Sequence, residues 1–212
     1  MKKILLLATV VFTVSILRAQ NTSFGVQAGV TFPSFKIKSE EEDVSKSFDI
    51  KPGFTVGVVS NIALGSMFSF QPSLNFIQKG GKEKEDDESE KLTLNYLELP
   101  LNFVFNASSK SGKFFAGAGP SLSFGLSGKE KFEAEGIGEE EEDINFGSDE
   151  DELKAFELGL NIIAGYQFTN GLFLAANYNA GLSDLSNVDG TKFHNRYFAL
   201  RVGFMFGGNS KK

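Results

Sequence analysis

The chain has 212 residues, which suits a single domain, and the absence of Cys excludes disulfide frameworks, Cys-ligated zinc, iron–sulfur clusters and thiol catalysis. Its formal charge of −6 argues against nucleic-acid binding, which needs a basic surface. With 23 Phe, 23 Gly and no Trp, the composition is unusual for a soluble helical enzyme.

The first 19 residues have the pattern of a secretory signal peptide. Lys2 and Lys3 form a basic start, and an apolar segment follows over 4–17. That segment is shorter than the ~20 residues that a membrane-spanning helix needs. Ala19 suits the position before a cleavage site, so we expect a signal peptide over 1–19 and one mature domain over 20–212. An uncleaved anchor is the alternative, and loss of the leader would lower the charge to −9.

After the leader, apolar residues alternate with small or polar ones, which is typical of half-buried β-strands. The alternation predicts strands over 24–32, 54–62, 68–76, 97–105, 114–126, 156–168, 172–182 and 198–206. These eight segments are long enough for the ~9–11 residues with which a tilted strand crosses a membrane.

The two faces of these strands distinguish a membrane barrel from a soluble one. The apolar set contains no charge, and the set between consists mainly of Gly, Ser, Asn and Gln. A soluble, lipocalin-like binder of hydrophobic ligands would carry Lys, Glu and Arg on its outer face, and it is the alternative. We therefore expect an all-β fold, an eight-stranded up-and-down antiparallel transmembrane β-barrel whose apolar residues face lipid.

The fourth strand changes phase along its length. Leu92, Leu94 and Tyr96 are apolar at even positions, whereas the apolar positions are odd from Leu97 onward. A β-bulge near Tyr96–Leu97 would produce this change. Three successive strands each contain a proline, namely Pro72, Pro100 and Pro120. Proline removes a ladder hydrogen bond, so we expect a local irregularity on that side of the wall.

Long and short connections alternate along the chain. The long ones are 33–52, 78–91, 127–154 and 184–195, and the short ones are 63–66, 106–113 and 169–171. This alternation is typical of outer-membrane barrels, which have short periplasmic turns and longer external loops. An even number of strands then places both termini in the periplasm.

Acidic residues are concentrated in the first three long loops, where 23 of the 27 Asp and Glu lie. The simplest interpretation is a set of solvated, self-repelling loops. Runs of carboxylates could instead bind divalent cations or a basic partner, although their spacing does not match an EF-hand. The candidate metal ligands are Glu139, Glu140, Glu141, Glu142, Asp143, Asp149 and Asp151.

Opposite charges fall among the residues that are expected to face the barrel interior. Glu98 and Arg201 lie near the middle of the fourth and eighth strands, which face each other in an eight-stranded barrel. A buried charge needs a partner, so we expect an ion pair between Glu98 and Arg201, which Glu157 could join. The alternative is that water hydrates each charge separately. A filled interior argues against an open pore, for which about 16 strands are needed.

No catalytic signature is present. His194 lies near Ser183 and Asp184, but none of the known nucleophile sequences surrounds the serine. The segment 117–119 lacks the third Gly of a dinucleotide-binding loop. We therefore expect no catalytic residues, no cofactor and no enzymatic activity.

Several short motifs follow one another along the chain: Gln71-Pro72, Lys79-Gly80, Tyr96-Leu97-Glu98-Leu99-Pro100-Leu101, Ala118-Gly119-Pro120, Gly165-Tyr166 and the final segment 203–207. Together they resemble the PorT-like outer-membrane β-barrel family of Gram-negative bacteria, and the segment 96–101 is the most specific of them. The resemblance covers nearly all of the mature chain and implies a small outer-membrane barrel with a cleaved signal. One member of that family is associated with secretion and gliding machinery, but the resemblance is carried over here for fold and location only. The acidic loops and the six residues after Phe206 depart from the pattern.

These expectations combine into an integral outer-membrane protein, monomeric, with a structural or interaction role and acidic extracellular loops. Its expected partners are outer-membrane lipid, with other envelope proteins and divalent cations as further candidates, and no nucleic acid. The alternatives are an accessory component of an envelope transport or secretion system and a small-solute channel.

Overall fold

The computed structural model describes residues 22–39, 44–85, 88–134 and 138–207, so the predicted signal peptide over 1–19 lies outside the described residues. No helix among these residues has the length and apolar character needed to cross a membrane. The strands are β1 (Thr22–Ser39), β2 (Val44–Ser47), β3 (Gly53–Ala63), β4 (Phe68–Glu85), β5 (Glu88–Ser109), β6 (Gly112–Ala134), β7 (Gly138–Ile144), β8 (Phe156–Phe168), β9 (Leu172–Gly181) and β10 (Thr191–Phe206).

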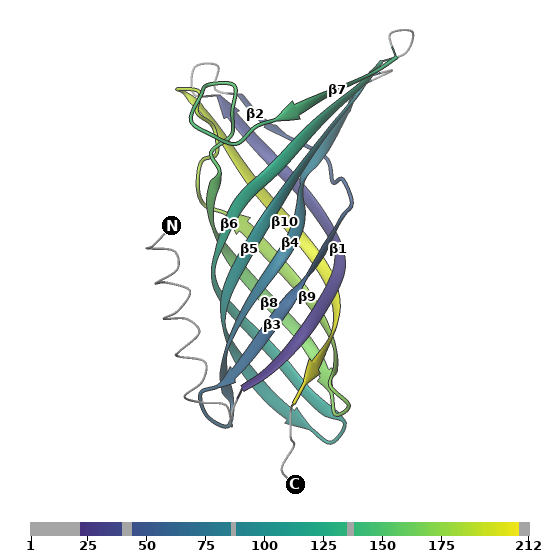
Figure 1. Ribbon diagram of the computed structural model, residues 1–212, viewed down its shortest axis with the longest axis vertical. Coiled ribbons are helices and arrows are strands. Elements are labelled where there is room, and N and C mark those ends of the chain that lie inside the picture. Colours follow the sequence, from purple (N-terminus) through teal and green to yellow (C-terminus); the bar gives the residue numbers. More distant parts are fainter. Residues whose placement is uncertain (1–21, 40–43, 86–87, 135–137, 208–212) are drawn as a thin grey trace.

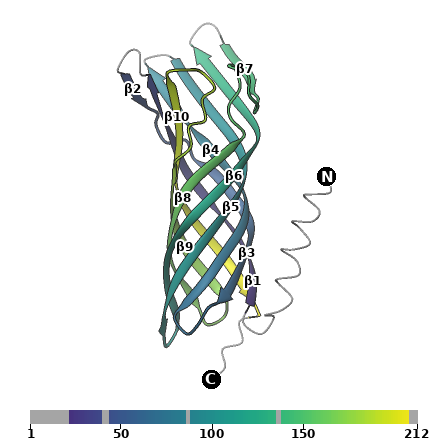
Figure 2. The same ribbon diagram turned by 90° about the vertical axis from the view of Figure 1, so that its left-hand side faces the viewer.

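Eight of these strands form a closed up-and-down barrel (Figures 1 and 2). The wall strands pair antiparallel, each with the next along the chain, in the order β1, β3, β4, β5, β6, β8, β9 and β10. β10 then pairs back onto β1 over its full length. The short strands β2 and β7 add to β1 and β6 at one end of the barrel, which we call the hairpin end. The opposite end, where β1 begins and β10 ends, is the terminal end. The predicted eight-stranded antiparallel fold is confirmed.

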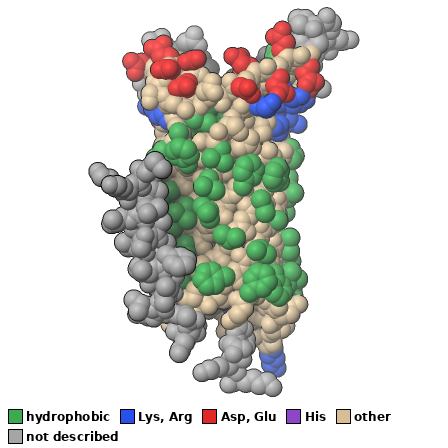
Figure 3. Space-filling view, viewed as in Figure 1, with side chains coloured by type: hydrophobic (Ala, Val, Ile, Leu, Met, Phe, Trp, Pro, Cys, Tyr) green, Lys and Arg blue, Asp and Glu red, His purple; other side chains and the backbone are tan. Residues whose placement is uncertain are grey.

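The apolar residues of the alternating pattern face outward. On β10, Phe198 and Leu200 are exposed, whereas the residues that follow them, Ala199 and Arg201, are buried. Hydrophobic side chains are spread over the wall between the two ends of the barrel (Figure 3). Such an outer surface suits the hydrocarbon of a bilayer and not water. The soluble, lipocalin-like alternative is therefore wrong.

The strands at the hairpin end extend much further than expected. We predicted a loop over 78–91, but β4 reaches Glu85 and β5 begins at Glu88. Similarly, β6 and β7 occupy much of the loop predicted over 127–154, and residues 33–39 and 191–195 belong to β1 and β10. The apolar alternation ends where these strands leave the barrel, although their ladders continue. The β6–β7 ladder places Lys129 opposite Asp143 and Lys131 opposite Glu141, whereas the β4–β5 ladder places Lys82 opposite Lys91 and Glu83 opposite Glu90.

The connections at the terminal end are short, as expected. In the turn over 169–171, Gly171 has a φ of 95°, a conformation that glycine adopts without steric cost. The Asn170 side-chain oxygen accepts a hydrogen bond of 3.1 Å from the backbone N–H of Leu172. The Asn-Gly pair thus supplies the backbone freedom and the local hydrogen bond that a tight turn needs.

The phase change in the fourth wall strand has a different cause from the one predicted. Along β5 the inward positions continue without a break from Leu94 through Tyr96 to Glu98, so β5 itself contains no bulge. The β5–β6 register does shift between Asn95 and Tyr96, and the extra residue is Leu126 on β6. The predicted irregularity at the three prolines takes the form of gaps in the ladders and not of a register shift. Pairing is interrupted between Val59–Ser73 and Ile62–Phe70, between Pro72–Leu101 and Asn75–Glu98, and between Pro100–Ser121 and Phe103–Ala118, while each ladder keeps one register across its gap.

Buried side chains form layers in the barrel interior. Read from the hairpin end, the inward residues of β5 are apolar (Leu92, Leu94), then polar or charged (Glu98, Asn102), then apolar again at Val104. The apolar layer at the hairpin end, here called the upper cluster, consists of Phe35, Ile77, Leu92, Leu94, Tyr96, Leu185, Phe193, Tyr197 and Ala199. The layer near the terminal end, the lower cluster, consists of Val59, Val104, Phe115, Ile163, Phe173, Ala175 and Met205. The polar layer between them holds the interior charges.

Candidate functional site

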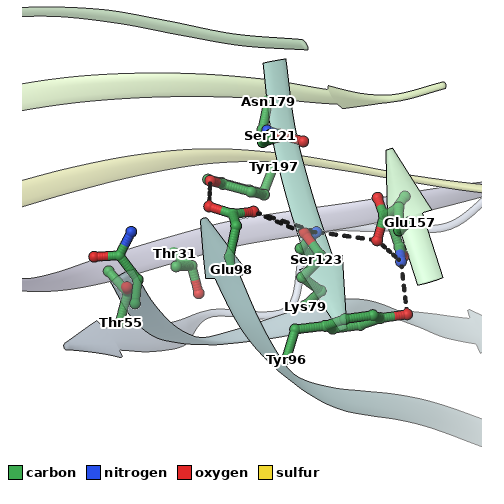
Figure 4. Close-up of polar contacts among 12 residues, drawn as sticks. Thr31, Thr55, Lys79, Tyr96, Glu98, Ser121, Ser123, Glu157, Asn179 and Tyr197 are labelled. Carbon is green, nitrogen blue, oxygen red and sulfur yellow. Dashed lines mark hydrogen bonds and ion pairs between the residues drawn. The ribbon is translucent and has the colours of Figure 1, made fainter. Parts of the chain in front are cut away.

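A buried lysine is the centre of the interior charge cluster (Figure 4). Lys79 on β4 places its Nζ 3.0 Å from Glu157 Oε2 on β8 and 3.3 Å from Glu98 Oε2 on β5. The same ammonium donates a 3.0 Å hydrogen bond to Ser123 Oγ on β6. All three charged side chains are at most 1% exposed. One ammonium therefore pairs with two carboxylates that come from different parts of the wall, and a second positive charge is needed to balance them.

Two tyrosines and an asparagine complete this cluster. The Tyr197 hydroxyl donates a 2.6 Å hydrogen bond to Glu98 Oε1, and the Asn195 amide donates to Glu157 Oε2 at 3.3 Å. The Lys79 ammonium lies 4.7 Å from the ring centroid of Tyr96 and 5.6 Å from that of Tyr197, within range of a cation–π interaction. Each charged side chain thus contacts residues from several strands, and these contacts link strands that are distant in the sequence.

Arg201 has a looser place in the cluster. Its Nη2 lies 4.0 Å from Glu98 Oε1, so the structure brings the two residues of the predicted ion pair together. Glu157 joins them only through Lys79, which we had assigned to a loop. The Nε and Nη2 atoms of Arg201 are buried and make no hydrogen bond within the protein. Extending the odd-numbered inward positions Asn75 and Ile77 by two residues would have identified Lys79.

The upper cluster closes the barrel above these charges. Phe35 stacks between Phe48 and Phe193, with ring centroids 3.9 Å and 4.9 Å away. The Asn187 amide donates hydrogen bonds to the carbonyls of Gly147, Asp149 and Glu152, which joins the connection after β7 to the connection after β9. The interior is therefore packed at the hairpin end, and the lower cluster packs it near the terminal end.

The β6–β7 hairpin has two different faces beyond the barrel. On one face Lys129 pairs with Glu141 and Lys131 pairs with Glu139. On the other face Glu130, Glu140 and Glu142 lie beside Phe132, and with Glu141 these residues line a cavity of about 430 Å³ to which no lysine contributes. The register places Glu130 directly opposite Glu142, a like-charge pair. Acidic side chains cover both tips of the hairpin end, with basic ones beneath them (Figure 3).

The pairing on the first face predicts a pH dependence. A hydrogen bond from Lys129 lowers the pKa of Glu141 below 4.5, and one from Lys91 lowers the pKa of Glu133. Because these pKa values are lower in the folded hairpin than in the unfolded chain, the ion pairs stabilise the hairpin at pH values above the unfolded pKa of about 4.5. This stabilisation is lost as the pH falls through the folded-state pKa. We expect backbone amides of β7 to lose exchange protection below pH 4.5 while the wall strands keep theirs, measured by NMR. Equal loss in β7 and β9 would contradict this.

The candidate metal ligands are not gathered at one place. Glu139 and Glu141 bind lysines, whereas Glu140 and Glu142 point to the opposite face of β7. Asp149 and Asp151 lie in the connection between β7 and β8. Among the residues with described positions, no three His, Asp or Glu side chains approach closely enough to hold a metal ion.

The residues around His194 have structural roles. Asp184 Oδ1 accepts hydrogen bonds from the backbone N–H of Ser186 and of Phe193, and Ser183 Oγ accepts one from Leu158. His194 lies within β10, paired with Lys36, and not in the loop that we predicted. Asp184 and Ser183 thus organise the connection before β10.

The family model for the outer membrane protein β-barrel domain matches residues 18–187. The chain belongs to this family. Membership agrees with the apolar outer wall and assigns the protein to the outer membrane of a Gram-negative envelope. No curated relative matches the chain.

Solved structures of small outer-membrane barrels resemble this family member. Ail, the attachment invasion locus protein of Yersinia pestis, is 17% identical with a TM-score of 0.45, covering 88% of this chain and 100% of Ail. Neisserial surface protein A is 16% identical with a TM-score of 0.46 and the same coverages. OprG from Pseudomonas aeruginosa is 10% identical with a TM-score of 0.45, covering 88% of this chain and 96% of OprG.

Proposed function

We propose that this barrel is a non-enzymatic interaction protein that presents its acidic β6–β7 hairpin outside the cell to a basic partner. The proposal includes a cleaved signal peptide over 1–19 and both termini in the periplasm. Its orientation is supported by the long hairpins at one end and the short turns at the other, as in other outer-membrane barrels.

The observation that carries the proposal is the unequal distribution of charge on the β6–β7 hairpin. Lysines neutralise carboxylates on one face, whereas the face around Phe132 has only carboxylates beside the ring. Like charges placed side by side destabilise a hairpin, so a basic ligand would relieve that repulsion. In the described part of the chain β7 pairs only with β6, which leaves its outer edge open to an extended segment.

The binding experiment compares the two faces of the hairpin. Full-length barrels in detergent are titrated with a short oligolysine peptide at low and high salt. We expect the triple variant Glu130→Gln, Glu140→Gln, Glu142→Gln to bind more weakly than Glu139→Gln, Glu141→Gln, which removes carboxylates only from the face that binds lysines. A further control, Asp184→Asn with Asp189→Asn, changes charge away from this hairpin. Equal binding by the triple variant and the wild type would refute the proposed face.

The orientation can be tested separately because the chain has no cysteine. Ser148 is exposed at the hairpin end and Asn170 is exposed at the terminal end. We expect a membrane-impermeant maleimide to label Ser148→Cys on intact cells, and Asn170→Cys only after the outer membrane is permeabilised. The reverse labelling pattern would mean that the acidic hairpin faces the periplasm.

An accessory role in an envelope transport or secretion system is the second candidate. Crosslinking in cells followed by purification under denaturing conditions would recover a specific envelope partner if this role is correct.

A further inference from the structure

An open, shallow groove lies on the outer wall near the terminal end. Its volume is about 850 Å³, and its lining is almost wholly apolar, contributed by β5, β6, β8, β9 and β10. Three alanines, Ala116, Ala164 and Ala176, form its floor in a single row across adjacent strands. Because the row contains only methyl side chains, the wall is locally thin there, and the surrounding large side chains project beyond it.

Large apolar side chains border this floor. Phe105 and Leu200 end the alanine row on either side, and both are nearly half exposed, at 44% and 48%. Phe114 and Leu174 stand on the side nearer the terminal end, at 60% and 51% exposed. The convex wall of a second barrel would meet these projecting side chains before it reached the alanines. A flexible hydrocarbon chain can follow the floor between them.

The end of the groove nearest the termini leads to a basic turn. Tyr166 lines the groove with its ring, and its hydroxyl lies 2.7 Å from Ser111 Oγ in the β5–β6 turn. Lys110, the neighbour of Ser111, is exposed. Ala107 at the groove is three residues from Lys110, about 10 Å along an extended strand. A tyrosine with its ring in apolar surroundings and its hydroxyl at a polar edge is typical of a membrane interface.

Lys110 is distinctive among the described connections at the terminal end. The connections over 64–67 and 169–171 contain no charged residue. The β5–β6 hairpin therefore supplies positive charge at the place where the apolar groove ends, and a lysine near a membrane surface attracts anionic headgroups. The groove and the turn together match a molecule with a hydrocarbon chain joined to a phosphate.

We propose that this groove is a binding site for an anionic phospholipid. One acyl chain lies over the alanine row, and the phosphate lies against Lys110 with the Ser111 and Tyr166 hydroxyls beside it. The site takes its leaflet, the periplasmic one, from the proposed orientation of the barrel. The binding itself does not depend on the acidic hairpin or on that orientation.

The experiment uses native mass spectrometry of the full chain in detergent, titrated with phosphatidylglycerol or with zwitterionic phosphatidylcholine. We expect the wild type to bind one phosphatidylglycerol with an affinity about fivefold above that for phosphatidylcholine, the effect of one lysine at a surface. Ala164→Phe fills the groove and should abolish retention of both lipids. Lys110→Gln should remove the preference while chain binding remains.

Two matched variants control for bulk and charge. Ala28→Phe adds the same ring at an exposed position on β1, and Lys113→Gln removes a charge from the same hairpin at a residue that lines the mouth of the barrel. Both should bind lipid as the wild type does, and a heat-dependent gel shift establishes that each variant is folded. Equal binding by Ala164→Phe and Ala28→Phe would overturn the proposal.

A wild-type dimer that Ala164→Phe converts to a monomer would instead make the groove an interface between copies. A maleimide result that reversed the orientation would change the leaflet and leave these affinities as they are.

Discussion

Replacing Lys79 with Met should lower the free energy of unfolding by about 3–5 kcal/mol, the usual loss when one partner of a buried ion pair is removed. Lys79 is the ammonium within 3.3 Å of both Glu98 and Glu157. Without the ammonium, two carboxylates that are at most 1% exposed lose their shared positive partner, and the apolar Met side chain, of similar length to Lys, lies between them. Urea titration of the folded barrel in lipid vesicles measures this change.

Arg201→Met is the informative comparison for Lys79→Met. Arg201 approaches a carboxylate at 4.0 Å, and two of its buried nitrogens make no hydrogen bond within the protein. Removing it deletes a weak contact together with a buried charge that is poorly compensated, so we expect a smaller loss of stability with membrane insertion intact. A loss for Arg201→Met that equals or exceeds the loss for Lys79→Met would show that Lys79 is not the centre of the cluster.

A double variant tests whether the loss arises from unpaired charge. Adding Glu157→Gln to Lys79→Met leaves one carboxylate, Glu98, beside one guanidinium, Arg201, and neutral groups of similar shape often replace a buried ion pair at little cost. The amide oxygen at position 157 can still accept the hydrogen bond from Asn195. We therefore expect the double variant to regain most of the lost stability. No recovery would point to packing around the Lys79 side chain as the cause.

The wall of the barrel could be predicted from sequence because lipid and a packed interior impose opposite demands on neighbouring residues. Phe198 and Leu200 had to be apolar outside, and Arg201 between the outward positions had to face the interior. The same parity identified Glu98 and Glu157 as interior charges. Lys79 escaped notice because the apolar alternation ends close to it, although its inward position follows directly from Asn75 and Ile77 on β4.

Features that depend on pairing between strands could not be derived in this way. The phase change at Leu97 marks the border between an apolar and a polar interior layer, and the extra residue, Leu126, belongs to the neighbouring strand. The carboxylate run on β7 looked like one set of metal ligands. Its register against β6 divides it into a face that binds lysines and a face that does not. Sequence spacing alone contains neither the register nor the partner strand.

Replacing Phe35 with Ala should weaken the upper cluster by about 3–5 kcal/mol, the range for removing a buried phenyl ring and leaving a cavity. Phe35 is 2% exposed and stacks on two other rings. The backbone N–H of Leu185 bonds to Phe193 O, and the N–H of Phe193 bonds to Asp184, so both amides report on this cluster. We expect faster hydrogen exchange at these two amides than at β9 amides in the wall.

Phe54→Ala is the matched control because Phe54 is 48% exposed on the outer wall. Lipid can fill the space that its ring leaves, so the transfer energy is lost without a cavity, and the Leu185 and Phe193 amides should exchange as in the wild type. The same exchange pattern in both variants would mean that the upper cluster does not unfold as a local unit.

Opening that cluster should still not produce conductance in a planar bilayer. The interior charge cluster around Lys79 and the lower cluster around Val104 and Phe115 remain packed beneath the upper cluster. A current in Phe35→Ala that is absent from the wild type would assign closure of the interior to the upper cluster alone.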